Sequence, residues 1–256
     1  MSLNLENKNI VVTGATKGVG KELVKQLLEE GANVVLSGRD EHAVKDLISE
    51  VNQSKVRVLF VKTELENVED CKALFIEAEK QFGAIDGLVN YAGVTPIASL
   101  TDCTEEIYNQ VMNVNLRAPF FCTQMAIKNM LKYKRAGSIV QVGSSHAWSG
   151  EIDRAPYAIS KGGLLTLSEH ISHNYASFGI RSNYLTMGWT ATDGELQLRN
   201  ENGMSKEDLE QSAAKSIPMK KMIEYNDLIP GIKYLLSDGS KMVTGSNLRI
   251  TGGQYI

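Results

Sequence analysis

A short apolar segment, a glycine-rich turn and a helical pattern follow one another at the start of the chain. The apolar segment covers 8–13, the turn contains Gly14, Gly18 and Gly20, and the helical pattern covers 21–30. Glycines allow close backbone approach to a pyrophosphate, and the N–H groups at a helix N-terminus attract its charge. The unit therefore predicts a strand, a phosphate-binding loop and a helix. A tight strand-to-helix turn is the alternative, but one glycine would suffice for it.

Strand and helix patterns alternate along the rest of the chain. Strand patterns cover 33–37, 56–61, 85–89, 138–142, 180–185 and 248–250. Helical patterns cover 68–82, 105–116, 119–133, the segment that begins near Tyr157, and 226–236. Because parallel strands need crossover helices, we expect an α/β fold with a mostly parallel sheet and helices on both faces.

No linker or internal repeat interrupts this alternation, so we expect a single domain over 1–256. The least periodic long segment, 193–215, follows the sixth strand pattern. Open α/β sheets bind ligands beyond the carboxyl ends of their strands. We therefore expect 193–215 to form a substrate lid, with a surface insertion as the alternative.

Composition excludes several classes of protein. A net charge of −3 argues against a nucleic-acid surface, and no apolar segment approaches the ~20 residues of a membrane span. The first residues lack the basic and apolar regions of a signal peptide. The three cysteines and four histidines show no metal-binding spacing, so we expect no metal and a cytoplasmic location.

Two cations bear on the choice of nucleotide. A carboxylate at the end of the second strand of a dinucleotide-binding fold holds a ribose 2′-hydroxyl, whereas a basic residue accommodates a 2′-phosphate. Here the second strand pattern is followed by Gly38 and Arg39, and Lys17 lies in the glycine-rich turn. The pair favours NADP, with NAD possible. Two solvated surface charges are the alternative interpretation.

The segment 137–161 contains a candidate proton donor. Ser144 and Ser145 follow the strand pattern, and Tyr157 and Lys161 lie four residues apart on one helical face. A nearby cation favours tyrosinate, so the phenol pKa, roughly 10 in isolation, should fall toward neutrality. Such a tyrosine can exchange a proton with a hydroxyl or carbonyl, and a serine can hold the same oxygen. The spacing alone also fits an ordinary amphipathic helix.

In order and spacing, these motifs together resemble the short-chain dehydrogenase/reductase family over nearly the whole chain. Thr13-Gly14-xxx-Gly18-x-Gly20 resembles the family's cofactor loop, and Asn90-Tyr91-Ala92-Gly93 resembles its turn after the fourth strand. Asn115, Ser144, Tyr157 and Lys161 fall at the positions of its catalytic tetrad, and the interval of 13 residues before Tyr157 selects Ser144 over Ser145. The resemblance implies a Rossmann-like, doubly wound sheet. It also implies an NAD(P)-dependent oxidoreductase that interconverts a secondary alcohol and a ketone by hydride transfer.

The resemblance also implies a role for each residue of the tetrad. Tyr157 exchanges the proton, Ser144 holds the substrate oxygen, Lys161 lowers the tyrosine pKa and binds the nicotinamide ribose, and Asn115 orients a water. The residues that the resemblance places around the cofactor are Gly14, Thr16, Lys17, Gly18, Val19, Gly20, Arg39, Glu64, Leu65, Asn90, Ala92, Gly93, Tyr157, Lys161, Gly188, Thr190 and Thr192. Three positions depart from the family pattern: Tyr91 replaces a small or amide residue, Glu64 an aspartate, and Met187 a proline.

The substrate is the least determined part of the prediction. The residues expected around it are Thr95, Ser144, His146, Trp148, Tyr157 and Trp189, a polar set with two indoles. This set favours a small polar substrate such as a sugar or polyol. A 3-oxoacyl-acyl-carrier-protein reductase is the main alternative: Arg135 resembles one of the two bases that dock the carrier, but Phe178 occupies the other position.

Two further expectations complete the prediction. The chain could be a cofactor-binding regulator without activity, but such proteins usually lose the tyrosine or the lysine, and both are present here. We also expect a homotetramer, from the resemblance and from apolar positions on the helical patterns at 105–133 and 155–178.

Overall fold

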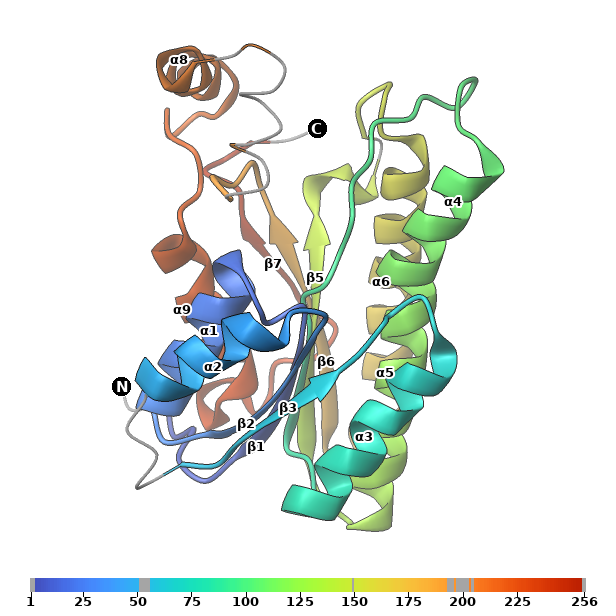
Figure 1. Cartoon of the computed structure of the whole chain (residues 1–256), viewed down its shortest axis with the longest axis vertical. Coiled ribbons are helices and arrows are strands. Elements are labelled where there is room, and N and C mark those ends of the chain that lie inside the picture. Colours follow the sequence, from blue (N-terminus) through green and yellow to red (C-terminus); the bar gives the residue numbers. More distant parts are fainter. Residues whose placement is uncertain are drawn as a thin grey trace.

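The apolar strand patterns pair into one seven-stranded sheet, seen in the computed structural model of the chain (Figure 1). The structure describes residues 3–50, 56–148, 150–192 and 205–254, together with positions 196 and 203. The strands are β1 (Asn9–Thr13), β2 (Asn33–Gly38), β3 (Val58–Lys62), β4 (Gly87–Asn90), β5 (Gly137–Ser144), β6 (Ile180–Met187) and β7 (Asn247–Ile250). Every adjacent pair is parallel, which confirms the predicted α/β class.

The strand order β3-β2-β1-β4-β5-β6-β7 places a switch point at the centre of the sheet. The chain runs outward from β1 to β3 and then returns to β4 on the other side of β1. Thr13 pairs in register with Asn90, so the carboxyl ends of β1 and β4 lie together. Ligands of open α/β sheets bind at such a point, because the connections there diverge to opposite faces.

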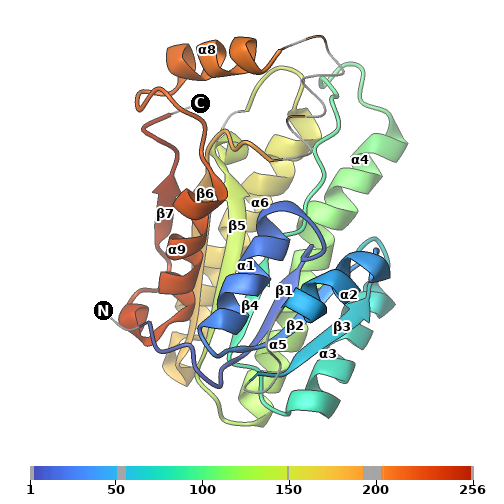
Figure 2. The same ribbon diagram turned by 60° about the vertical axis from the view of Figure 1, so that its left-hand side comes forward.

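Helices cover both faces of the sheet (Figures 1 and 2). One face carries α1 (Gly18–Glu29), α2 (Glu41–Glu50) and α9 (Tyr225–Leu236), and the other carries α3 (Val68–Phe82), α5 (Ala118–Lys132) and α6 (Ala155–Asn174). α4 (Glu105–Met112) packs beside α6, and α8 (Lys206–Ser216) lies beyond the carboxyl ends of the strands. Short 3₁₀ turns cover Ser145–Ala147, Ala176–Phe178 and Asp238–Ser240.

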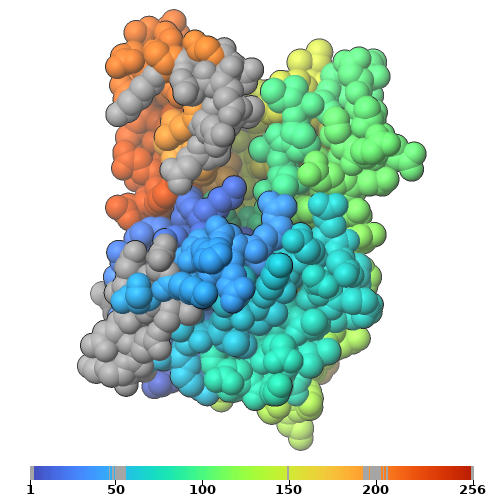
Figure 3. Space-filling model, in the orientation of Figure 1, coloured from blue at the N-terminus to red at the C-terminus, as the bar shows by residue number. Residues whose placement is uncertain are grey.

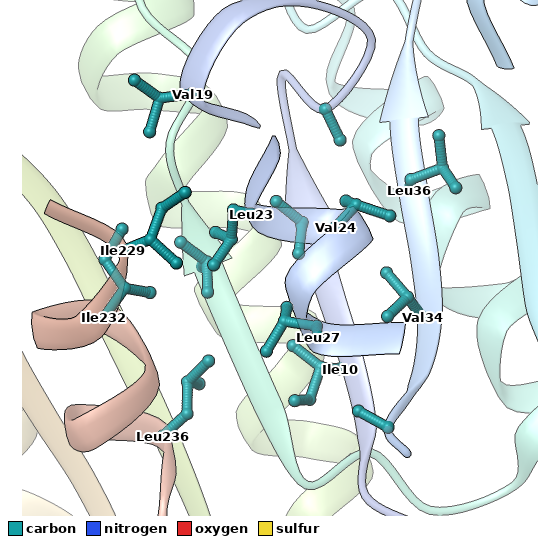
Figure 4. Close-up of a cluster of buried hydrophobic side chains, with 14 of the residues drawn as sticks. Ile10, Val19, Leu23, Val24, Leu27, Val34, Leu36, Ile229, Ile232 and Leu236 are labelled. Atoms are coloured by element: carbon teal, nitrogen blue, oxygen red, sulfur yellow. The ribbon is translucent and has the colours of Figure 1, made fainter. Parts of the chain in front are cut away.

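The core beneath α1 fixes the position of the glycine-rich turn. Leu23, Val24 and Leu27 of α1 pack between the strand residues Ile10, Val34 and Leu36 and the α9 residues Ile229, Ile232 and Leu236 (Figure 4). All of these side chains are buried, and full burial of each aliphatic side chain contributes about 1.5–3 kcal/mol. The turn before α1 is therefore attached to a rigid layer.

Most predicted elements lie within two or three residues of the observed ones. α3 has the predicted bounds, whereas α1 begins at Gly18 instead of residue 21. The helix α2 was not predicted. Asp40 begins it, since its carboxylate accepts hydrogen bonds from the N–H groups of His42 and Ala43.

The helices predicted at 105–116 and 119–133 form one continuous rod. A π-helical turn, Asn113–Arg117, joins α4 to α5. Pro119 gives a physical reason for it, because proline has no N–H to donate to the carbonyl of Asn115 four residues earlier. The N–H of Ala118 bonds instead to the carbonyl of Asn113. Such turns are common at functional sites, and this one contains Asn115.

The first part of the predicted lid, 193–215, lies mostly outside the described residues, which exclude 193–195, 197–202 and 204. Its final part belongs to α8, which begins with a reciprocal capping box between Ser205 and Asp208. Within the described ranges, no helix is long and apolar enough to cross a membrane, and no cluster of side chains has the composition of a metal site.

Candidate active site

The glycine-rich turn packs directly on the turn that follows β4. Gly14 has a φ of +69°, and a Cβ atom there would lie 2.8 Å from Cα of Ala92. A Cβ atom on Gly20 would lie 2.2 Å from the carbonyl oxygen of Gly14. Lys17, the N-cap residue of α1, makes no side-chain capping bond. The uncapped helix N-terminus and the close-packed glycines fit a dinucleotide pyrophosphate.

The end of β2 contacts the same turn. The N–H of Ala15 donates to the carbonyl of Ser37 at 3.0 Å, and a Cβ atom on Gly38 would lie 2.4 Å from the Thr16 methyl carbon. Lys17 and Arg39 each follow one member of the Thr16–Gly38 contact, and both are exposed. The structure therefore brings the two predicted cations to one place.

Neighbouring charges do not neutralise these cations. The Asp40 carboxylate caps α2, and it forms no ion pair with Arg39 in the described structure. Lys62 ends β3 and pairs in register with Gly38, so it adds a third cation at this edge. Lys62 was not among the predicted cofactor residues, although its position directly after a predicted strand was the available signal. Glu64 is exposed and Leu65 packs against the core.

Hydrogen bonds to buried side chains of the sheet and of α5 fix the turn after β4. The hydroxyl of Thr13 accepts hydrogen bonds from the N–H groups of Tyr91 and Ala92, at 3.2 and 3.3 Å. The amide of Asn90 is buried and donates to Thr123 and Gln141, so it organises the turn from inside the sheet. Burial raises the pKa of the Tyr91 phenol, which therefore stays neutral.

Three members of the predicted tetrad surround the end of β5 and the first turns of α6. Lys161 is 4% exposed, donates from Nζ to the carbonyl of Val142 at 3.0 Å, and has Nζ 5.6 Å from the centre of the Tyr157 ring. Burial lowers the pKa of Lys161 to about 8. Ser144 is the last residue of β5. The site thus holds a buried cation beside a phenol and a hydroxyl.

Asn115, the fourth member, bonds across to the segment after β4. Its side chain accepts from the N–H of Val94 and donates to the carbonyl of Val94, each at 2.8 Å. It also donates to the Ser160 hydroxyl at 3.4 Å. A Cβ atom on Gly93 would lie 3.4 Å from Asn115 Oδ1 and 3.7 Å from Lys161 Nζ. Gly93, Asn115 and Lys161 are therefore neighbours, as their positions in the family pattern require.

A residue that the sequence did not reveal anchors Ser144. The hydroxyl of Tyr184 on β6 accepts from the N–H of Ser144 at 2.9 Å and lies 3.4 and 3.3 Å from the carbonyls of Ser144 and Lys161. A Cβ atom on Gly143 would lie 1.7 Å from the Tyr184 ring, so glycine is needed there. The hydroxyl of Ser144 accepts from the N–H of His146 at 3.2 Å.

The predicted substrate residues come from the end of β5 and from the segments that follow β4, β5 and β6. The molecular surface is hollowed beyond the carboxyl ends of the strands. Figure 3 shows this hollow between the orange α8 region and the green α4 region. The rings of His146 and Tyr157 pack edge to face, with their centroids 5.6 Å apart. Trp148 is half-exposed, and the guanidinium carbon of Arg249 lies 4.7 Å from the centroid of its ring. Thr95 is exposed in the segment between β4 and α4.

The segment after β6 supplies the remaining predicted residues. Gly188 packs closely on Thr251, since a Cβ atom there would lie 2.7 Å from the Thr251 Cα. Thr190 is buried and donates to the carbonyl of Gly188 at 2.9 Å, and the N–H of Trp189 donates to Gln254 at 3.3 Å. The N–H of Thr192 donates to the carbonyl of Thr190 at 2.8 Å. This segment is therefore tied to the end of the chain after β7.

Comparisons with known proteins agree with this geometry. The short chain dehydrogenase family matches residues 8–203. The chain is 30% identical over 251 residues to a 3-oxoacyl-[acyl-carrier-protein] reductase of Staphylococcus epidermidis, covering 98% of this chain and 100% of the relative. It is also 30% identical over 256 residues to L-rhamnose 1-dehydrogenase (NAD(P)(+)) of Azotobacter vinelandii, with 98% of each chain covered. A variant of actinorhodin polyketide ketoreductase, solved with NADPH, superposes with a TM-score of 0.89 at 26% identity, covering 96% of this chain and 97% of that one.

The chain therefore belongs to the short-chain dehydrogenase/reductase family, as the motifs predicted. Its sheet is the Rossmann-like sheet of that family, and its reaction class is NAD(P)-dependent oxidoreduction.

Proposed function

We propose that the protein is an NADP(H)-preferring oxidoreductase that interconverts a secondary alcohol and a ketone on a small polar substrate. The observation that carries the proposal is the buried Lys161 ammonium beside the Tyr157 ring, with Ser144 at the end of the adjacent strand. A bound nicotinamide supplies or accepts the hydride in this family. The groups of the chain have to bind the substrate, orient it and move one proton.

In this proposal Tyr157 is the proton donor to the carbonyl oxygen and the acceptor in the reverse reaction. Lys161 has a pKa of about 8, so it is mostly protonated at neutral pH. Its positive charge near the ring stabilises the tyrosinate that remains after proton transfer. The hydroxyl of Ser144 donates to the substrate oxygen, and Asn115 orders the proton path beside Lys161. A positioned acid–base group of this kind contributes about 10²–10⁴-fold to the rate.

The cofactor would lie across the switch point between β1 and β4. The glycine-rich turn, including Thr16 and Val19, would hold the pyrophosphate, while Lys17 and Arg39 would bind a 2′-phosphate. Their shared location beside the Thr16–Gly38 contact supports NADP over NAD. Gly93, Lys161 and the segment from Gly188 to Thr192 would surround the nicotinamide half.

A second candidate function is the reduction of 3-oxoacyl groups on an acyl carrier protein. The full-length similarity to such a reductase favours it. The docking residues argue against it, because Arg135 already bonds to the Asp86 carboxylate at 2.9 Å and an exposed phenylalanine, Phe178, occupies the other basic position. We therefore favour the small polar substrate.

A turnover assay with both cofactors tests the proposal. Secondary alcohols and ketones, including sugars, polyols and short hydroxy acids, are compared with a 3-oxoacyl thioester and its carrier-bound form. We expect turnover of a small polar compound with NADP(H), and a loss of at least about 100-fold in Tyr157→Phe, with cofactor affinity within a few-fold. Turnover of only the carrier-bound thioester would support the second function. Near-normal turnover in Tyr157→Phe would contradict the assigned role of the tyrosine.

A further inference from the structure

Arg154 is a buried cation that the reaction described above does not use. It is 6% exposed, and its Nη1 atom has no hydrogen-bond partner in the part of the chain that the structure describes. No carboxylate within the described residues forms an ion pair with it. Burying a guanidinium without a counter-charge is unfavourable unless another group brings the negative charge. Among the described residues, the Arg154 guanidinium therefore has no directly bonded counter-charge.

The backbone holds Arg154 at the entrance to α6. Its N–H donates to the carbonyl of Glu151 at 3.0 Å, and its carbonyl accepts from the N–H of Ala158 at 2.9 Å. Ala98, from the segment after β4, forms a parallel bridge with it. Arg154 is the N-cap residue of α6 and precedes Tyr157 by three residues. Its backbone is thus fixed at the end of the helix that carries the reacting group.

His146 links Arg154 to the catalytic tyrosine. Its ring contacts the Tyr157 ring at 5.6 Å, and its Nδ1 accepts from the N–H of Glu151 at 3.3 Å. Burial lowers the pKa of His146; Glu151 and Asp153 raise it and Arg154 lowers it, so all three charges lie within electrostatic range of the ring. Neither Glu151 nor Asp153 forms an ion pair with Arg154 among the described residues. Within the described ranges, Arg154 is therefore an unpaired cation near the ring that contacts Tyr157.

We propose that Arg154 binds the carboxylate of a short hydroxy acid or oxo acid whose reacting carbon faces Tyr157. This inference rests on the proposed function and narrows its substrate class. One buried cation balances the single charge of a carboxylate, and a guanidinium can hold a carboxylate through two parallel hydrogen bonds. Because Arg154 is only three residues from Tyr157 in the chain, we expect a substrate with only a few bonds between carboxylate and hydroxyl. In oxidation the carbinol carbon would give a hydride to the oxidised nicotinamide, the hydroxyl proton would pass to the Tyr157 phenolate, and the carboxylate would be unchanged.

Pairs of substrates that differ only in charge test the proposal kinetically. Short 2- and 3-hydroxy acids are compared with their primary amides, which have the same number of heavy atoms. We expect the wild type to favour the acid by at least about 10-fold in kcat/KM, since a charge-assisted pair outweighs a neutral hydrogen bond. Arg154→Gln should lower kcat/KM for the acid by about 10- to 100-fold, mainly through KM, and leave the amide within a few-fold. Arg154→Lys should recover part of the loss.

A matched control separates this effect from a general change of charge or stability. Arg57→Gln removes the same charge from an exposed arginine that bonds to the Gln81 carbonyl and stacks on Phe82 at the other end of the sheet. It should not alter the ratio of acid to amide. Equal turnover of acid and amide by the wild type, or equal losses for both in Arg154→Gln, would overturn the proposal.

Equilibrium binding keeps this inference distinct from the proposed function. Butyrate, butyramide and propylphosphonate are titrated into the wild type and Arg154→Gln with NADP⁺ present, and binding is measured by calorimetry. We expect butyrate to bind the wild type more tightly than either other probe and to lose about 10-fold or more in the variant. Such a result without turnover of any alcohol would refute the proposed function and leave the anion site standing. Equal butyrate binding in both proteins, or preference for the phosphonate, would refute the carboxylate assignment.

Discussion

Lys161 shows how a single residue combines an energetic cost with a chemical role. It is buried without a carboxylate partner among the described residues, and its Nζ bonds to one backbone carbonyl, that of Val142. Desolvation therefore makes its charged form less favourable than in water, and its pKa falls from 10.5 to about 8. In the proposed function, the cation at this position favours the ionised form of Tyr157, which gives a reason for the cost.

The desolvation of Lys161 predicts that the stability of the folded protein depends on pH. Between the folded pKa of about 8 and the unfolded value of 10.5, the unfolded lysine binds more protons than the folded one, so stability should rise with pH in this window. Relative to Lys161→Met, the cofactor-free wild type should gain about 2 kcal/mol between about pH 7.5 and pH 9.5. Urea unfolding of both proteins at several pH values measures the difference. Parallel stability curves would show that the lysine is not desolvated.

The cations beside the Thr16–Gly38 contact predict cofactor choice. A 2′-phosphate carries close to two negative charges. Arg39 can bind it through two hydrogen bonds, and Lys17 can attract it as a point charge. Both side chains are exposed, so after screening by water and salt we expect a preference of roughly 5- to 150-fold for NADP. Lys17→Ala combined with Arg39→Asp should turn the preference toward NAD. Higher salt should shrink the wild-type preference.

Steady-state kinetics with both cofactors at low and high salt measures this preference. Lys25→Ala combined with Arg57→Asp, which changes the charge equally away from the contact, is the matched control. Better use of NAD than NADP by the wild type at low salt would show that these cations do not bind the phosphate.

Individual elements differ in how far the sequence determines them. The bounds of α3 were predicted because its ends carry local signals: Asn67 caps the first turn and Gly83 follows the last residue. α2 was missed because Asp40 was considered only as a charge near Arg39, whereas its carboxylate caps that helix. The π turn around Asn115 was also missed, since two separate helices were predicted at 105–116 and 119–133. Local signals thus located the elements but not every junction.

The junction of β5, β6 and α6 predicts a role for Tyr184. Its hydroxyl accepts the N–H of Ser144, so Tyr184→Phe leaves a buried donor without a partner, at a cost of about 1–3 kcal/mol. Ser144 should then be held less firmly, so kcat should fall several-fold while the dissociation constant of the cofactor changes little. Urea unfolding and steady-state kinetics measure both effects. Tyr108→Phe, at a half-exposed position on α4, is the control. Unchanged stability and kcat would contradict this positioning role.

The assembled molecule contains contacts between separate elements that local sequence patterns do not reveal. Ordered motifs indicated where the predicted tetrad and cofactor loop lie, because each motif is short and lies next to the end of one strand or the start of one helix. Tyr184 contributes through a contact between two strands, the bond from the Ser144 N–H on β5 to its hydroxyl on β6. That Arg154 Nη1 lacks a hydrogen-bond partner among the described residues is likewise visible only once those residues are placed. Contacts between separate elements therefore add what single motifs do not contain.

The outer face of α4 and α6 predicts the assembly of the whole molecule. Tyr108 and Ile159 are 44% and 52% exposed, and with Leu100, Cys103 and Pro156 they line a cavity of 310 Å³. Because apolar surface of this kind is rarely left open, we propose that the face pairs with a second copy by two-fold symmetry within a homotetramer. Light scattering at micromolar concentration should give the mass of four chains, and Ile159→Arg should give a smaller species. Ile76→Arg, on the exposed side of α3, should leave the mass unchanged. A monomeric wild type, or an Ile159→Arg variant of undiminished mass, would exclude this face as the interface.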